Sequence, residues 1–333
     1  MHNVVIKITT AVFLFSTALP TMAQNIVPNY SFENYINLPC GFICDSMEFS
    51  SSVSDWNLPT AGTSDIHTTL VPQNCWAHQP TSTYTGSACQ PGGQLPRTGN
   101  VMAGLLTYTL FWGEYREYIQ IQLTQTMVVG ETYCVEMWTS LGDKSSHASN
   151  NLGIYFSTNS LNVSNSFPLP YTPQVNATNV ITDFTNWVPI RDTVTATQPW
   201  EYLIIGNFYD DASTTHTPNG GPCSQMSYYY IDDVSVIHLS RPDLGPDTTL
   251  CHGDSLNLDA QTTADNYLWS TGDTTQTIII DSPGIYWVSV GAGSCVLTDT
   301  IEIMPGNPTP QLGPDTTICE GQSLLLNAGP GSS

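Results

Sequence analysis

The feature that most constrains this chain is a tandem repeat near its C-terminal end. The segment LGPDTTLCHGDSLNL, which begins at Leu244, returns almost unchanged 68 residues later as LGPDTTICEGQSLLL, which begins at Leu312. A repeat of this length, rich in Thr, Asp and Gly, is typical of an array of modules and not of one catalytic globule. The second copy stops at Ser333, so we interpret residues 311–333 as the truncated start of a second module. We expect specificity to lie in the unique segment before the repeats, which the repeats would hold away from a surface.

The N-terminal segment, residues 1–23, has the pattern of a secretory signal peptide. Lys7 precedes an apolar run at residues 11–19, and small residues occupy the cleavage-specifying positions at Thr21 and Ala23. The apolar run is shorter than the ~20 residues that a membrane helix needs, which argues against the alternative of an uncleaved anchor. We therefore expect a secreted chain without membrane insertion.

The repeats contain three of the nine cysteines. Cys251 lies in the first copy, and Cys319 occupies the matching position of the second copy. Cys295 is the other cysteine of the first copy, which predicts a disulfide between Cys251 and Cys295. The partner of Cys319 would then lie beyond the end of the given sequence.

The six cysteines before the repeats could form three disulfides, with fifteen possible connectivities. They are Cys40, Cys44, Cys75, Cys89, Cys134 and Cys223. The first two are spaced loosely like metal ligands, but no second close pair of Cys or His completes a zinc set. Disulfides are favoured because a secreted chain occupies an oxidising compartment.

The charge balance excludes several classes of partner. Six Lys and Arg residues stand against 28 Asp and Glu residues, for a formal net charge of −22. Binding to nucleic acid or to an anionic membrane surface requires clustered basic residues, and the sequence has no such cluster. The acidic excess serves either solvation or affinity for divalent cations.

The hydrophobic pattern before the repeats is that of an all-β chain. Apolar and polar residues alternate at residues 116–123 and 132–138, with the period of two that is expected of strands. Further segments rich in β-branched and aromatic residues lie at residues 151–157, 186–196, 201–208 and 228–237. We expect residues 24–239 to form one sandwich of two sheets.

A change of composition at residues 240–242 marks the end of this domain. Short strand-like segments follow, and Trp269 stands where an immunoglobulin-like sandwich places its core Trp. We therefore predict an Ig-like module over residues 243–305. A linker rich in Pro and Asn follows at residues 305–310 and should be extended.

Several segments resemble known families. The opening NIVPNYSFE and the closing YYYIDDVSVI resemble the first and last strands of galactose-binding-like β-jelly rolls, the fold of several carbohydrate-binding module families. The segments between them look like jelly rolls of large secreted proteins of gliding bacteria. The LGPDTT repeat is similar to the Ig/PKD-like stalk modules of those proteins. The resemblance implies a cell-surface protein that the secretion machinery recognises through a C-terminal sorting domain, which is missing from this sequence.

The resemblance also implies a structural calcium ion that ties the first strand to the last. Carried over by position, the candidate ligands are Glu33 and Asp232, with Asp233 as the less favoured partner. Calcium takes several hard oxygen ligands, which two carboxylates and neighbouring carbonyl groups could supply. The alternative is that these carboxylates face solvent or accept backbone hydrogen bonds.

A glycan site needs aromatic faces for the sugar rings and polar groups for the hydroxyl groups. The polar faces of the two central strands offer Gln120, Gln122, Glu136 and Trp138, and neighbouring loops offer Tyr108, Trp112, Tyr115 and Trp76. Aromatic residues in a sandwich more often belong to the core, because buried area dominates their energetics. Trp112, followed by Gly113, is the one that we most expect to be exposed.

We expect no catalytic residues. The sequence has no HExxH pair, no G-x-S-x-G elbow and no glycine-rich phosphate loop. The leading hypothesis is a non-catalytic, adhesin-type jelly roll that binds an extracellular glycan and is presented on an Ig-like stalk. One alternative is a purely structural surface component without a small ligand. The other is a glycoside hydrolase or its accessory domain, in which Glu136 would pair with Asp210 or Asp211.

Overall fold

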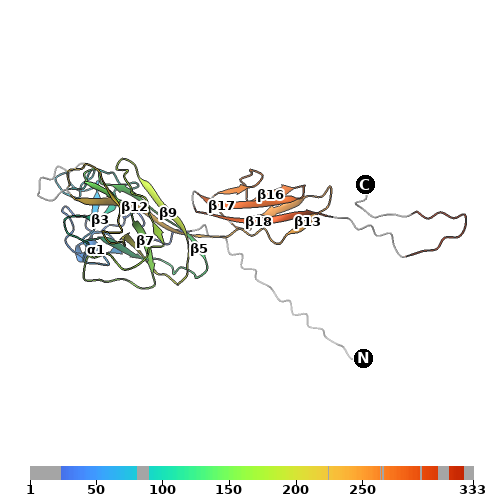
Figure 1. Ribbon diagram of the computed structural model, residues 1–333, viewed down its shortest axis with the longest axis horizontal. Coiled ribbons are helices and arrows are strands. Elements are labelled where there is room, and N and C mark those ends of the chain that lie inside the picture. Colours follow the sequence, from blue (N-terminus) through green and yellow to red (C-terminus); the bar gives the residue numbers. More distant parts are fainter. Residues whose placement is uncertain are drawn as a thin grey trace, which may run out of the picture.

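The computed structural model describes residues 24–80, 90–223, 225–262, 264, 266–292, 295–306 and 315–325 (Figure 1). Within these residues the chain forms eighteen strands and one short helix, arranged as two β-sandwiches that follow each other along the longest axis of the molecule. No helix in the described part of the chain is long and apolar enough to cross a membrane. The expected signal peptide lies outside the described residues.

The first sandwich contains strands β1 to β12. One of its sheets has the order β2-β3-β12-β5-β9, and all its neighbouring strands are antiparallel. Its strands are β2 (Asp65–Thr68), β3 (Val101–Thr109), β12 (Met226–Leu239), β5 (Thr132–Leu141) and β9 (Val188–Thr195). The long β12 is the central strand, so the end of the domain pairs with both its early and its middle parts.

The opposing sheet has the order β1-β4-β10-β7-β8. Its strands are β1 (Trp56–Asn57), β4 (Tyr118–Gln122), β10 (Tyr202–Asn207), β7 (Leu152–Ser157) and β8 (Val175–Asn176). Two short strands, β6 (His147–Ser149) and β11 (His216–Pro218), form a separate pair. The one helix, α1 (Ser46–Ser52), begins after Asp45, whose side chain accepts a hydrogen bond from the backbone N–H of Glu48.

Alternation along the strands builds the core between the two sheets. In β4 the side chains of Ile119 and Ile121 join the core, whereas in β5 those of Val135 and Met137 do so from the opposite sheet. The first described residues close the domain: Asn25 forms a β-bridge with Ile237 of β12. The first and last segments of the domain therefore lie side by side, as the resemblance implied.

The second sandwich contains strands β13 to β18 in two sheets, with orders β13-β18-β17-β15 and β14-β16. They are β13 (Thr248–Leu250), β14 (Leu256–Asp259), β15 (Tyr267–Trp269), β16 (Thr277–Ile280), β17 (Gly284–Ala292) and β18 (Cys295–Pro305). Trp269 is buried in a core of its own with Val288 and Ile301. The all-β prediction, a jelly-roll-type sandwich followed by an Ig-like sandwich, is confirmed.

The disulfides correct one prediction. Cys295 is bonded to Cys134 of β5, and Cys251 is an exposed thiol, so the expected Cys251–Cys295 pair is wrong. Cys295 begins β18, whereas Cys251 follows β13, whose Leu250 pairs with Pro305 at the other end of β18. An eleven-residue strand spans about 33 Å, which separates the two cysteines far beyond bonding distance.

The remaining cysteines are only partly paired. Cys40 is bonded to Cys75, and Cys223 is also disulfide-bonded. Cys89 lies outside the described residues, and the other exposed thiols of the described part are Cys44 and Cys319. Disulfides persist in oxidising compartments, which agrees with an extracellular location.

Candidate functional site

The most exposed aromatic surface of the first sandwich lies on the connection between β3 and β4. We name residues 110–115 the aromatic loop. Phe111 is 72% exposed and Trp112 is 61% exposed, as we expected for Trp112. The loop turns at Gly113, which has φ of 68° and open space around it. The end of β3 thus projects two large rings into solvent.

The rings of the aromatic loop pack against one another. The centroid of the Trp112 ring lies 5.7 Å from that of Phe111, at an interplanar angle of 88°. It also lies 5.6 Å from the centroid of the Tyr115 ring, at 59°. Trp112 is therefore in contact with two rings that are steeply inclined to it, and the three form one cluster.

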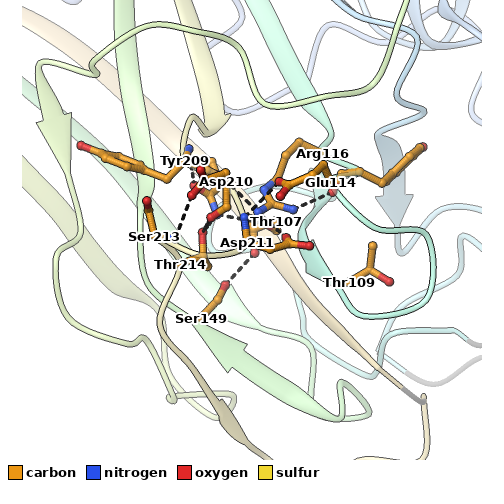
Figure 2. A network of polar contacts seen from close by, with 12 residues as sticks. Thr107, Thr109, Glu114, Arg116, Ser149, Tyr209, Asp210, Asp211, Ser213 and Thr214 are labelled. Atoms are coloured by element: carbon orange, nitrogen blue, oxygen red, sulfur yellow. Dashed lines mark hydrogen bonds and ion pairs between the residues drawn. The ribbon is translucent and has the colours of Figure 1, made fainter.

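A buried arginine fixes the base of the aromatic loop (Figure 2). Arg116 is fully buried, and its Nη2 donates to Asp211 Oδ1 at 2.8 Å and to the carbonyl of Tyr209 at 3.0 Å. The backbone N–H of Asp211 donates in turn to Glu114 Oε2 at 3.0 Å. Arg116 is buried and Asp211 is 28% exposed, so the ion pair is partly shielded from water and connects the two loops.

A chain of hydrogen bonds continues from this ion pair into the sandwich (Figure 2). Asp210 Oδ1 accepts the backbone N–H of Ser213 at 2.8 Å, and Thr214 Oγ1 donates to the carbonyl of Asp210 at 2.8 Å. Asn207 Nδ2 donates both to Thr214 Oγ1 and to the carbonyl of Thr107 in β3, each at 3.0 Å. Hydrogen bonds from Ser213 hold the pKa of Asp210 below its ordinary value, so this exposed carboxylate is charged at neutral pH.

Tyr115 anchors the other side of the loop. Its hydroxyl donates to Glu117 Oε1 at 3.1 Å and accepts the backbone N–H of Thr63 at 3.2 Å. Glu117 Oε2 accepts the backbone N–H of Leu106 at 2.7 Å. Burial raises the pKa of Glu117 to about 7. Buried polar groups thus hold the C-terminal end of the aromatic loop through both Tyr115 and Arg116.

Trp76 belongs to a buried layer and not to a binding surface. It is 4% exposed, and its ring lies 5.0 Å from that of His67. His67 is itself buried, with Nε2 at 3.0 Å from the hydroxyl of Tyr228, which donates to Asp65 Oδ2 at 2.9 Å. Burial lowers the pKa of His67 to about 3. Trp76 covers this polar network on the outer face of β2 and β12.

Tyr108 is also buried, at 2% exposure, which differs from the expected loop position. Its ring stacks on that of His216 at 4.4 Å, with an interplanar angle of 21°. The Arg116 guanidinium lies 5.8 Å from the Tyr108 ring centroid. Tyr108 is a residue of β3 and packs behind the aromatic loop instead of within it.

The structure does not bring the four residues of the expected groove together. Gln120 and Gln122 lie on β4, whereas Glu136 and Trp138 lie on β5, in the opposite sheet. Because each pair points outward from its own sheet, the two pairs occupy opposite faces of the sandwich. Gln122 is exposed, but Gln120 is buried, with Nε2 at 2.9 Å from Asn57 Oδ1 and Oε1 accepting the backbone N–H of Leu161.

Glu136 and Trp138 are half-buried and engaged with arginines. Glu136 forms an ion pair with Arg191 and accepts a hydrogen bond from Trp138 Nε1 at 2.8 Å. The Arg97 guanidinium lies 3.7 Å from the centroid of the Trp138 ring. One face of the Trp138 ring is thus covered by the chain's own arginine.

The three expected calcium ligands receive hydrogen-bond donors. Glu33 Oε1 accepts the backbone N–H groups of Asn100 and Val101, at 2.7 and 2.8 Å. Asp232 Oδ2 accepts the N–H of Arg97 at 2.8 Å, and the Arg97 side chain forms an ion pair with Asp233. Burial, followed by the charge of Asp233, raises the pKa of Asp232 to about 8.

Calcium requires six to eight oxygen ligands, whereas these three carboxylates already accept hydrogen bonds from N–H groups or an ion pair from a guanidinium. Among the described residues, no three Asp, Glu, His or Cys side chains are grouped so that they could hold a metal ion. Calcium therefore stays a prediction from the resemblance.

Comparisons with known proteins give similarity to solved structures alone. No family model matches the chain. No curated protein matches it either. The tandem N-terminal CBM22 domains of Paenibacillus barcinonensis Xyn10C match with a TM-score of 0.36 and 12% identity, over 82% of this chain and 63% of that chain.

Two further solved structures are similar. The K3 adhesin domain of Lys-gingipain from Porphyromonas gingivalis matches with a TM-score of 0.30 and 15% identity, over 64% of this chain and 96% of that chain. The CBM22-1 xylan-binding domain of Paenibacillus barcinonensis Xyn10C matches with a TM-score of 0.29 and 13% identity, over 44% of this chain and 78% of that chain. At TM-scores this low, the similarities carry no weight for ligand or activity.

Proposed function

We propose that the first sandwich is a non-catalytic glycan-binding domain of an extracellular surface protein, and that the glycan lies against the aromatic loop. The observation that carries the proposal is the exposure of Phe111 and Trp112 on a loop whose base is buried and hydrogen-bonded. Adjacent exposed aromatic rings on a folded domain mark an interaction surface, because a domain that binds nothing gains stability when such rings are buried in its own core.

The chemistry of the loop suits a sugar. The apolar C–H faces of a pyranose stack on aromatic rings, and carboxylates accept hydrogen bonds from its hydroxyl groups. Glu114 lies between the aromatic residues in sequence, and Asp210 is exposed on the neighbouring loop that Arg116 ties to it. Because the base is already ordered, binding costs little additional conformational entropy.

The second sandwich fits the role of a stalk. It is joined to the first sandwich by the chain at residues 240–247 and by the Cys134–Cys295 disulfide. Two covalent connections restrict rotation of one sandwich against the other, which would present the aromatic loop in a defined direction. The same disulfide favours the second candidate function, a structural surface component without a small ligand.

Hydrolysis is the less supported candidate. Two of the three carboxylates considered for it are bound to arginines: Glu136 pairs with Arg191, and Asp211 pairs with Arg116. A glycosidase needs two carboxyl groups that are free to act on the sugar bond, and these two are engaged within the protein.

A glycan array tests the proposal, with the chain from Gln24 onward as the probe. Binding to a defined class of sugars that is lost in Trp112→Ala and Phe111→Ala supports it. The matched control is Phe184→Ala, which removes an exposed ring on the β8–β9 connection and should leave binding unchanged. Absence of binding by folded wild-type protein, or binding that both loop variants retain, contradicts the proposal and favours the structural candidate.

A further inference from the structure

We propose that the glycan recognised by the aromatic loop carries free amino groups, so that the ligand is cationic. The inference rests on the proposed function and deepens it, since it names the chemical class of the sugar. Three features of the site support it: the arrangement of the rings, the charges around them, and the position of the nearest arginine.

The rings form an open cluster that suits a cation. A cation is attracted to the face of an aromatic ring within about 6 Å of its centroid, and Trp is the strongest of these partners. Trp112 has two neighbouring rings, at 88° and 59°, and it is largely exposed. An ammonium group can therefore approach an accessible part of the Trp112 ring face, next to two further aromatic rings.

The charges around the cluster are negative. Glu114 lies within the loop, and Asp210 and Asp211 lie on the loop that is bonded to it. Arg116 is the cation of this network, but it is fully buried and is paired with Asp211. Glu114 and Asp210 form no ion pair in this network, so the aromatic loop and the loop bonded to it carry more negative than positive charge.

The position of Arg116 matters for the choice between anionic and cationic glycans. A site for uronic acids or sulfated sugars needs an accessible arginine or lysine, since these side chains bind carboxylate and sulfate groups directly. Here Arg116 is fully buried, whereas Asp210 is exposed and Glu114 is half-buried. The chain as a whole has a net charge of −22, which also repels anionic polymers.

The test compares three sugars by isothermal titration calorimetry at about pH 6, where amines are protonated. The probes are a β-1,4-linked glucosamine hexasaccharide, its fully N-acetylated counterpart and an oligogalacturonate of the same length. We expect the amino sugar to bind about tenfold more tightly than the N-acetylated sugar at low salt. The preference should shrink in 1 M salt, where the Debye length is about 3 Å.

Isosteric variants show which carboxylates cause the preference for the amino sugar. Glu114→Gln and Asp210→Asn each remove one charge and keep an oxygen for the backbone N–H that the carboxylate now accepts. Each should reduce the preference for the amino sugar by about threefold. The charge-matched control is Asp273→Asn on the second sandwich, which should leave the preference unchanged.

Trp112→Ala separates site binding from general attraction of a cationic polymer to an acidic protein. In this variant the preference should disappear, whereas attraction to the overall charge would persist. Equal affinity for the amino and N-acetylated sugars, both lost in Trp112→Ala, overturns the inference and leaves the proposed function standing. Failure of all three sugars to bind, together with a silent glycan array, overturns both.

Discussion

The Cys134–Cys295 disulfide makes the strongest prediction about how the two sandwiches are coupled. The double variant Cys134→Ser with Cys295→Ser removes the bridge without leaving a lone thiol. In the variant, the chain at residues 240–247 is the remaining covalent connection between the sandwiches. The two hydrophobic cores are separate, so the first sandwich should remain folded when the second one unfolds.

The magnitude follows from the loop that the bridge closes. If the second sandwich unfolds while the first stays folded, this loop runs from Ser240 to Cys295, roughly 55 residues, and its closure is worth about 4 kcal/mol in the chain-entropy model. A module of about 60 residues has a total stability of about 3–9 kcal/mol. Loss of the bridge therefore removes a large share of the stability of the second sandwich, and its melting temperature should fall by about 20 °C.

Differential scanning calorimetry of the chain from Gln24 onward measures the effect. We expect one transition to move down by this amount and the transition of the first sandwich to stay nearly in place. The control is Cys251→Ser, which replaces an exposed thiol and should change neither transition. Peptide mapping under non-reducing conditions should recover Cys134 linked to Cys295. A Cys251–Cys295 peptide, or an unchanged thermogram for the double variant, refutes the reasoning.

Three further predictions concern the first sandwich. Burial raises the pKa of Glu117 to about 7 from the ordinary 4.5, so the free energy of unfolding falls as the pH rises between these values. The variant Glu117→Gln should therefore be more stable than the wild type by about 2 kcal/mol at about pH 8 and by much less at about pH 4. Urea titrations measure the difference, and equal differences at the two pH values would contradict this prediction. Gly104→Ala should cost about 1–3 kcal/mol in the same assay, because its Cβ would lie 2.4 Å from the buried Tyr228 hydroxyl, whereas Gly41→Ala, with open space, should cost far less. Because donors including Arg97 already bind the expected calcium ligands, the melting temperature should be equal in calcium and in EDTA. A clear drop in EDTA would instead establish the ion.

The strands could be predicted from the sequence because alternation is a local property. The pattern at residues 132–138 predicts which side chains point inward, and Val135 and Met137 indeed lie in the core. Trp269 could be assigned to the core of the second sandwich from its place between short strands. In each case, residues within a few positions of one another determine the outcome.

The assignment of strands to sheets could not be predicted in the same way. The alternating segments at β4 and β5 are nearly consecutive in sequence and have the same period, yet they belong to opposite sheets. Their partners decide this: β4 pairs with β10, and β5 pairs with β12, which lies about 90 residues further along the chain. No local signal distinguishes these pairings, so a groove that combined Gln120 with Glu136 was a reasonable but mistaken construction.

The same reasoning explains which aromatic residues remain available to a ligand. Trp76, Tyr108 and Trp112 are all large aromatic residues near predicted loops, but only Trp112 is exposed. Trp76 is covered because the segment that carries it folds back over the polar network of β2 and β12, and Tyr108 is covered by His216, more than 100 residues away in sequence. Trp112 is followed by Gly113, which has open space around it, and the buried Arg116 fixes the C-terminal end of the loop, so the Trp112 ring stays exposed. The exposed ring at such a site therefore depends on the buried polar groups that hold its loop. A search of a sequence for such sites should look for these buried polar residues and not for the aromatic residue.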